Sequence, residues 1–351
     1  MALGPIMLDL RGVTLEQDER NILKHPLVGG VILFSRNYES VGQLSALVDS
    51  IHAVREPMLL VAVDHEGGRI QRFRQGFTQL PACHLIGNQY DRDCTYGASL
   101  AEKAGWLMAI ELRSVGIDFS FAPVLDLFKG MSKVIGDRSF HKDPEVVAIL
   151  ARRYIEGMKR AGMAAVGKHF PGHGAVKEDS HHEIPIDYRR YEDIQMDDLV
   201  AFERLIHAGL AAIMPAHVIY PTVDDKPAGF SKIWLKQILR RQLGFQGTIF
   251  SDDISMAGAE FAGDYIQRTN MALDAGCDMV LVCNNQQAAI TILDEMKRDP
   301  DPVSQVRLMR MHGRLEITRE KMQKDNEWQK TVAEISSLET NPELELGDDA
   351  T

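Results

Sequence analysis

The sequence predicts an α/β fold, a closed single-domain (β/α)8 barrel of the TIM type. Short apolar segments that suit buried strands recur eight times along the chain, and longer segments with helical spacing lie between them. This alternation is typical of a parallel sheet with helical crossovers, and eight such units can close the sheet on itself. A doubly wound open sheet is the alternative, but no G-x-G-x-x-G motif follows the first apolar segment.

The expected elements follow one another along most of the chain. The strand candidates are residues 5–10, 30–34, 59–63, part of 116–127, 163–167, 210–214, 248–251 and 279–283. The clearest helical segments are 95–115, 144–162 and 233–243, and a helical pattern continues past Asn284 to about residue 329. We assign residues 1–330 to the barrel and residues 331–351 to an acidic C-terminal tail. From residue 337 onward this tail has five acidic residues, no basic ones and no aromatic ones, a composition that predicts disorder.

The bulk composition excludes several classes of function. The chain has 351 residues, of which 45% are hydrophobic, and a net charge of −11. The acidic balance argues against nucleic-acid and membrane partners, since both are polyanions, and no apolar run is long enough to span a bilayer. The N-terminus lacks the basic region of a signal peptide, and the four cysteines show no C-x-x-C pairing. We therefore expect a cytoplasmic protein with free thiols.

Polar residues stand where the predicted strands end. Active sites of barrel enzymes lie at the carboxyl ends of the strands, so these residues are the first candidates for a site. They are Asp64, Asp126, Lys168, His169, His217, Asp252, Asp253 and Asn284. Any one of them could cap a helix or solvate a loop, but a whole series is hard to explain in that way.

The stretch 163–182 is the densest in ionisable groups. Its strand delivers Lys168 and His169, and the proline and glycines of FPGHG then require a shaped loop. Asp179 and His181 follow at a spacing that places both side chains on one side of an extended segment. A carboxylate beside an imidazole orients the ring and favours its protonated form, so the pair is a candidate acid/base unit. A solvated surface run is the alternative.

Three further groups are open to two interpretations each. We expect Asp252 to carry chemistry and Asp253 to cap the helix after strand seven, because only one of the two can cap. The spacing of His169 and His173 suggests zinc, but proline and glycine exclude the helix on which that motif depends. The arginines and acids of DHEGGRIQR, with Arg138 in IGDRSF, could clamp a polyhydroxylated ligand or form a salt-bridged surface loop.

Taken together, these motifs resemble a known family. AVDHEGGRIQRF, SFAPVLDL, IGDRSF, GKHFPGHG, DSH, MPAH and FSDDISM occur in this order. The set resembles the bacterial, cytoplasmic, single-domain β-N-acetylhexosaminidases of glycoside hydrolase family 3, over roughly residues 3–322. The resemblance implies that Asp252 is the nucleophile of a retaining mechanism, that His181 is the general acid/base and that Asp179 is its partner. It assigns sugar binding to Asp64, Arg72, Arg138, Lys168 and His169.

The resemblance also implies a substrate and its reaction. The substrate is a terminal β-linked N-acetylglucosamine on anhydro-N-acetylmuramic acid, in muropeptides recycled from peptidoglycan, and no metal or cofactor takes part. A histidine suits the acid/base role because its free pKa of about 6.5 lies near neutral pH. We expect a monomer or weak dimer. A metal-dependent barrel hydrolase and a non-catalytic sugar-binding protein are the two alternatives.

Overall fold

The computed structural model describes residues 2–177, 184–299 and 301–338. Eight parallel strands form one sheet in the order β6–β3–β2–β1–β12–β11–β8–β7. All eight predicted strands are confirmed. They are β1 (Ile6–Asp9), β2 (Val28–Leu33), β3 (Leu60–Val63), β6 (Phe119–Ser120), β7 (Val166–Phe170), β8 (Ala212–Pro215), β11 (Thr248–Asp253) and β12 (Met279–Val282).

The two edges of this sheet meet just beyond β6. Val124 forms a parallel bridge to Lys168, and the Leu125 amide donates a 2.6 Å hydrogen bond to the Lys168 carbonyl. Ring contacts also cross the interior: Phe119 on β6 lies 5.2 Å from Phe250 on β11, although these strands are not neighbours in the sheet. The sheet is therefore a closed barrel filled by side chains, and the open-sheet alternative is excluded.

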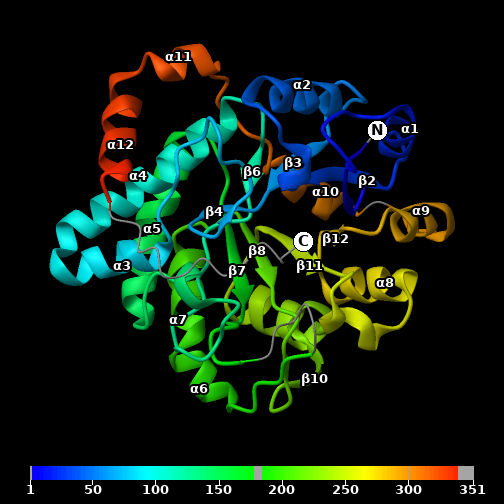
Figure 1. The fold of residues 1–351 in the computed structure, drawn as a ribbon. Coiled ribbons are helices and arrows are strands. Elements are labelled where there is room, and N and C mark those ends of the chain that lie inside the picture. The colour runs from blue at the N-terminus through cyan, green and yellow to red at the C-terminus, as the bar shows by residue number, and fades with distance from the viewer. Residues whose placement is uncertain (1, 178–183, 300, 339–351) are drawn as a thin grey trace.

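Helices surround the barrel (Figure 1). The three clearest helical predictions are confirmed by α4, by α5 and by residues 233–242, which are wound as a π-helix. Helix α5 begins where the sequence signals it, because Asp143 accepts a hydrogen bond from the Glu145 amide and Pro144 occupies the first turn. The α-helices are α1 (Gln17–Leu23), α2 (Val41–His52), α3 (Cys83–Arg92), α4 (Cys94–Arg113), α5 (Pro144–Arg160), α6 (Tyr191–Met196), α7 (Asp198–His207), α8 (Tyr265–Ala275), α9 (Gln286–Glu295), α10 (Pro302–Met309), α11 (Arg319–Gln323) and α12 (Asn326–Ser336).

The last helix corrects the predicted boundary between barrel and tail. Helices α11 and α12 lie beside α4 (Figure 1), and Lys103 on α4 forms a 2.6 Å ion pair with Glu334. Ile335 is 2% exposed and belongs to the hydrophobic core. The folded part of the chain therefore continues through Ser336 instead of ending at residue 330. Residues 339–351, where disorder is predicted, lie outside the described ranges.

Two short hairpins stand on the main sheet. The first, β4 (His65–Gly67) with β5 (Ile70–Gln71), continues directly from β3, and the second pairs β9 (Ile219–Tyr220) with β10 (Asp224–Pro227). Gly67 turns the first hairpin with φ at 108°, and a Cβ there would lie 2.5 Å from the Pro81 carbonyl oxygen. All four cysteines are free, as expected. Within the described ranges, no helix is both long and apolar enough to cross a membrane.

Candidate active site

Most of the predicted site residues lie at the carboxyl ends of the barrel strands. Asp64 follows β3 directly, while Lys168 and His169 belong to β7 and Asp252 to β11, so those two strands end later than expected. Arg138 comes from a short 3-10 helix, Gly136–Arg138, in the long connection after β6. Asp179 and His181, the predicted acid/base pair, lie outside the described residues.

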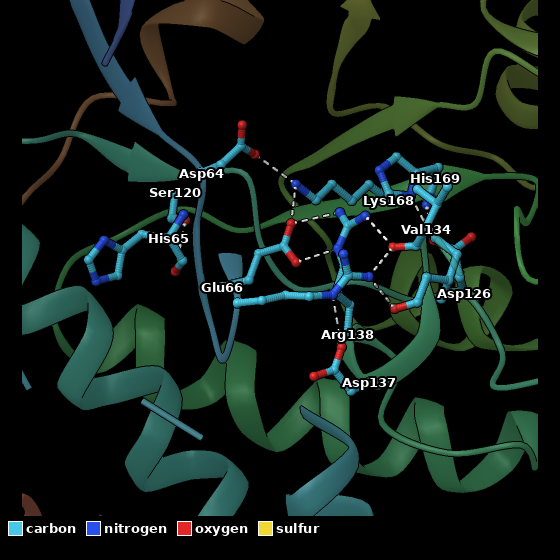
Figure 2. A network of polar contacts seen from close by, with 12 residues as sticks. Asp64, His65, Glu66, Ser120, Asp126, Val134, Asp137, Arg138, Lys168 and His169 are labelled. Atoms are coloured by element: carbon cyan, nitrogen blue, oxygen red, sulfur yellow. Dashed lines mark hydrogen bonds and ion pairs between the residues drawn. The ribbon is translucent and has the colours of Figure 1, made fainter. Parts of the chain in front are cut away.

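A buried ionic network joins the end of β3, the strand β4, the 3-10 helix and β7 (Figure 2). Lys168 Nζ lies 2.8 Å from Asp64 Oδ1 and 2.6 Å from Glu66 Oε1. Arg138 binds Glu66 in bidentate fashion, with Nε to Oε2 and Nη2 to Oε1 both at 2.8 Å. We call Asp64, Glu66, Arg138 and Lys168 the Glu66 cluster. It brings together three predicted sugar-binding residues and one, Glu66, to which the sequence analysis gives no role of its own.

The local backbone explains how Glu66 enters this cluster. Residues 64–66 are extended, so Asp64 and Glu66 point to the same side and His65 points to the other. Figure 2 shows the His65 ring turned away from the cluster, where it packs 5.7 Å from the rings of Phe73 and Phe77. Burial lowers the pKa of His65 to about 3, so it is neutral at pH 7. The i, i+2 spacing of two acids was therefore the signal that could have identified Glu66.

Glu66, Lys168 and Arg138 hold their charges in spite of burial. Burial raises the pKa of the Glu66 carboxyl, but the charges of Arg138 and Lys168 outweigh this and hold it well below its usual range. Burial lowers the pKa of Lys168 and of Arg138, yet both are raised by the carboxylates they face. The charges of Glu66 and Lys168 therefore depend on their partners, whereas the Arg138 guanidinium is charged in any case.

Arg72 lies at the edge of the cluster. Its Nη2 is 4.0 Å from Asp64 Oδ2, and its guanidinium lies 5.6 Å from the centre of the Phe34 ring. Its buried Nε has no hydrogen-bond acceptor among the described residues. Arg72 is thus beside the cluster but held loosely, with donors that a ligand could use.

A second group, around Asp126, fixes the loop after β7. The buried Asp126 carboxylate accepts hydrogen bonds from His169 Nδ1 at 2.7 Å and from the His173 amide at 2.6 Å. Because an ionised carboxylate only accepts, His169 carries its proton on Nδ1 and keeps Nε2 as its second polar atom. Burial, together with the charge of His169, lowers the pKa of His173 to about 4.

These contacts bear on the zinc alternative. The rings of His169 and His173 lie 6.1 Å apart and cross at a steep angle. Among the residues with described positions, no group of three His, Cys, Asp or Glu could hold a metal ion. The Asp126 carboxylate orients the His169 ring through the Nδ1 hydrogen bond.

The structure corrects the expected helix cap after β11. Asp253 does not cap a helix: its carboxylate accepts hydrogen bonds from Ser255 N at 2.9 Å, from Ser255 Oγ at 2.5 Å and from Cys283 N at 3.1 Å. The sequence could not show this, because β11 extends through Asp253 and ends in a tight turn. Burial raises the pKa of Asp253 to about 6. Asp252 is partly exposed beside it and accepts a hydrogen bond from the Asp253 amide.

His217 supports this strand end from β8. Its Nε2 donates a 3.0 Å hydrogen bond to the Asp253 carbonyl, and its ring stacks on Phe230 at 5.3 Å with a 15° angle between planes. His217 is one of the polar strand-end residues, but no role is predicted for it from the sequence. Its contact is with the main chain next to Asp252, so it helps to fix the direction in which that carboxylate leaves the strand.

The assembled site is rich in charge and close to neutral in sum. Asp64, Glu66 and Asp126 are balanced by Arg72, Arg138 and Lys168, and Asp252 lies near enough to His173 for its charge to act on the pKa of that imidazole. Such a site offers strong hydrogen-bond donors and acceptors without a net attraction for anions. It suits a neutral ligand with many hydroxyl groups, held beside a carboxylate.

Comparisons with known proteins agree with this geometry. Residues 6–314 match the family described as glycosyl hydrolase family 3 N terminal domain. A protein of Thioalkalivibrio sulfidiphilus named beta-hexosaminidase is 60% identical over 346 residues, covering 99% of both chains. NagZ from Neisseria gonorrhoeae, solved in complex with N-trifluoroacetyl-D-glucosamine, is 43% identical with a TM-score of 0.91, over 96% of this chain and 98% of that one.

A more distant structure shows the same barrel in a larger protein. It is a glycoside hydrolase family 3 beta-N-acetylglucosaminidase from Paenibacillus, 29% identical with a TM-score of 0.85. The match covers 95% of this chain but 66% of that one. The likeness therefore includes nearly all of the present chain and leaves part of the larger enzyme unmatched.

Proposed function

Because the chain belongs to glycoside hydrolase family 3 and is a β-N-acetylhexosaminidase, we propose that it removes terminal β-linked N-acetylglucosamine with retention of configuration. The observation that carries this proposal is the Glu66 cluster, an internally neutralised set of donors and acceptors at the barrel mouth. Asp64 accepts hydrogen bonds from sugar hydroxyls, and Arg72, Arg138, Lys168 and His169 offer donors or a second polar atom.

Asp252 is the proposed nucleophile. It stands at the end of β11 on a main chain held by His217 and by the bonds of Asp253. Its carboxylate attacks the anomeric carbon as the glycosidic bond breaks, and the leaving oxygen takes a proton from His181. Water then attacks the glycosyl ester and gives a proton to His181, so Asp252 is restored and the sugar leaves with its original configuration.

Asp179 and His181 take the acid/base role through electrostatics. Two anionic carboxylates, Asp252 and Asp179, favour the protonated imidazole while the bond to the leaving group breaks. Glycosylation removes the charge of Asp252, so His181 then loses its proton more easily and acts as the base toward water. This pair lies outside the described residues, and the proposal for it depends on the sequence motif.

The proposed natural substrate is a muropeptide that carries N-acetylglucosamine on anhydro-N-acetylmuramic acid, taken up from the cell wall and hydrolysed in the cytoplasm. The family motifs support this substrate. Mass spectrometry of purified muropeptides after incubation should show loss of a single N-acetylglucosamine, with the stem peptide unchanged.

The activity test compares three chromogenic glycosides. The 4-nitrophenyl β-N-acetylglucosaminide should be hydrolysed, while the β-glucoside and the β-xyloside should react far more slowly. A preference for either of the latter two would contradict the proposal. Activity that disappears in EDTA and returns with a divalent metal would favour the metal-dependent alternative instead.

The leaving group tests His181. General acid catalysis typically contributes about 10²- to 10⁴-fold, and a disaccharide needs it because its leaving alkoxide is poor. His181→Ala should lose activity on that scale with a disaccharide and much less in the first step with a dinitrophenyl glycoside, which should then show a pre-steady-state burst. An equal loss with both substrates and no burst would assign the acid role to another residue.

A further inference from the structure

Glu66 is the member of the Glu66 cluster that binds both of its cations, Lys168 and Arg138. Its side chain is 3% exposed, and one oxygen, Oε1, is bound both by Lys168 Nζ at 2.6 Å and by Arg138 Nη2 at 2.8 Å. The ammonium and the guanidinium therefore lie close together at the bottom of the site. Without the carboxylate between them, two buried cations would repel each other at short range.

The hydrogen bonds leave a defined set of donors for a ligand. Lys168 has three N–H groups, and two of them face Asp64 and Glu66. Arg138 has five, of which two go to Glu66 and one to the Val134 carbonyl at 3.1 Å. Counting contacts with described residues only, one N–H of Lys168 and one on each terminal nitrogen of Arg138 remain, and the bonds to Glu66 help to decide where they point.

We propose that Glu66 is a positioning residue for sugar binding: it aims Lys168 and Arg138 at the substrate and does not itself touch it. The proposal rests on the function proposed above, in which these two cations bind the sugar. It goes further, because it makes the orientation of both side chains and the charge of Lys168 depend on Glu66. Figure 2 shows the arrangement, with Glu66 between the two cations and Asp64 beyond Lys168.

The two cations respond differently to the loss of this carboxylate. A guanidinium stays protonated in any case, so Arg138 keeps its charge but loses the contact that orients it. Lys168 faces Asp64 and Glu66, whose charges raise its pKa, and also Arg138, whose charge lowers it as burial does. Once Glu66 is neutral, Asp64 alone opposes burial and Arg138, and Lys168 deprotonates at lower pH.

Glu66→Gln is the first test, because it keeps the shape and removes the charge. We expect kcat/KM for the 4-nitrophenyl β-N-acetylglucosaminide to fall roughly 10- to 100-fold, the scale of one or two lost charge-assisted hydrogen bonds. We also expect the alkaline limb of the kcat/KM profile to move to lower pH. A variant with wild-type kcat/KM and an unmoved alkaline limb would overturn the proposal.

Glu66→Asp distinguishes the effect of the negative charge from the effect of the side-chain length. The shorter acid keeps the negative charge near Lys168 but cannot span both cations, so kcat/KM should stay low while the alkaline limb returns toward its wild-type position. This variant also carries the test if Glu66→Gln does not fold. Wild-type kcat/KM in Glu66→Asp would show that the positions of the two cations do not depend on Glu66.

Asp137→Asn is the matched control. Asp137 pairs with Arg69 at 3.1 Å, so it joins the same hairpin to the same loop as Glu66 does, but it binds neither Lys168 nor Arg138. We expect kcat/KM within about threefold of wild type, with no shift of the alkaline limb. Equal effects of Asp137→Asn and Glu66→Gln would mean that Glu66 only docks the hairpin, and would overturn the proposal.

A double-mutant cycle completes the test. If Glu66 acts through Lys168, then Glu66→Gln and Lys168→Met together should lose much less kcat/KM than the product of the single losses. Multiplicative losses would refute this coupling. Failure of the wild-type protein to hydrolyse any β-N-acetylglucosaminide would instead refute the proposed function, and calorimetric binding of N-acetylglucosamine to Asp252→Asn with and without Glu66→Gln would then decide the positioning role by itself.

Discussion

Buried charges lie at both ends of the barrel, and they are bonded in different ways. At the amino ends, Asp118 before β6 accepts hydrogen bonds from the main-chain amides of Val61 at 2.8 Å and Gly313 at 2.9 Å. Asp278 before β12 accepts one from the Ile249 amide at 2.8 Å. At the carboxyl ends, the Glu66 carboxylate accepts hydrogen bonds from the Arg138 side chain and forms an ion pair with Lys168.

The cations show the same contrast. Arg113 beside Asp118 donates to the Ile117 and Leu315 carbonyls, and Arg240 beside Asp278 donates to the Phe245 and Gly247 carbonyls. Arg113 thereby joins its own helix end to the distant Leu315, and Arg240 holds the main chain that follows its own helix. Lys168 pairs with carboxylates and keeps a donor for a ligand. We conclude that Asp118 and Asp278 with their arginines stabilise the fold, whereas the Glu66 cluster prepares a binding surface.

The largest expected effect lies at the carboxyl end. Asp252→Asn is nearly isosteric but cannot form the glycosyl ester, so kcat should fall on the order of 10⁴-fold or more, with little change in the melting temperature. Asp253→Asn is the control: it should lower the melting temperature and reduce kcat far less. If Asp253→Asn abolishes turnover and Asp252→Asn does not, the choice of nucleophile is wrong.

The next effect tests the amino end. Asp118→Ala leaves Arg113 without a buried counter-charge and removes the acceptor of two main-chain amides, so the free energy of unfolding should fall by about 3–5 kcal/mol. In urea titrations the midpoint should shift, while kcat of the folded enzyme at low temperature stays close to wild type. Asp225→Ala, an exposed carboxylate on β10, should change stability by less than about 0.5 kcal/mol. A large loss of kcat in folded Asp118→Ala would remove the distinction between the two ends.

A smaller effect is expected for the predicted sugar-binding pair. Alanine at Lys168 or at His169 should lower kcat/KM by roughly 10- to 1000-fold, because each removes one or two charge-assisted hydrogen bonds to the sugar. Steady-state kinetics on the chromogenic substrate measure this directly. Unchanged kinetics in both variants would mean that Lys168 and His169 only stabilise the fold, as the buried charges at the amino ends do.

The smallest effect concerns pH. The folded pKa of Asp253 is raised to about 6, so its contribution to stability is complete below the unfolded value near about 4 and is lost as the pH rises through 6. From pH 7 to pH 5 it should add about 1 kcal/mol of stability, an increment absent from Asp253→Asn. Asp118, whose pKa is held low by its partners despite burial, has the opposite sign and loses its contribution in acid. The melting temperatures of the wild type and of Asp253→Asn should be measured between pH 7 and pH 5. If both change with pH in the same way, the raised pKa is wrongly assigned to Asp253.

The sequence predicted the barrel because apolar runs mark every strand, and it indicated a candidate site at the strand ends because polar residues end those runs. It did not predict the contacts that depend on the exact residue at which a strand ends. Asp253 was assigned to a helix cap because nothing in FSDDISM shows that β11 continues through it. Glu66 received no separate role because its partners, Lys168 and Arg138, are far away in sequence. The predicted end of the barrel, at residue 330, came too early, because the packing of Ile335 depends on tertiary contacts that the acidic composition does not reveal.

The pairing of β1 with β12 also determines how the chain can be made. On one edge β1 pairs with nearby β2, but on the other edge Ile6, Met7 and Leu8 pair with Val280, Leu281 and Val282, near the other end of the sequence. During synthesis one edge of β1 therefore stays unpaired until most of the chain has emerged, and unpaired strand edges are the usual route to aggregation. A nascent chain with such distant contacts folds late, so the yield of active protein in the cell should depend on chaperones and on growth temperature.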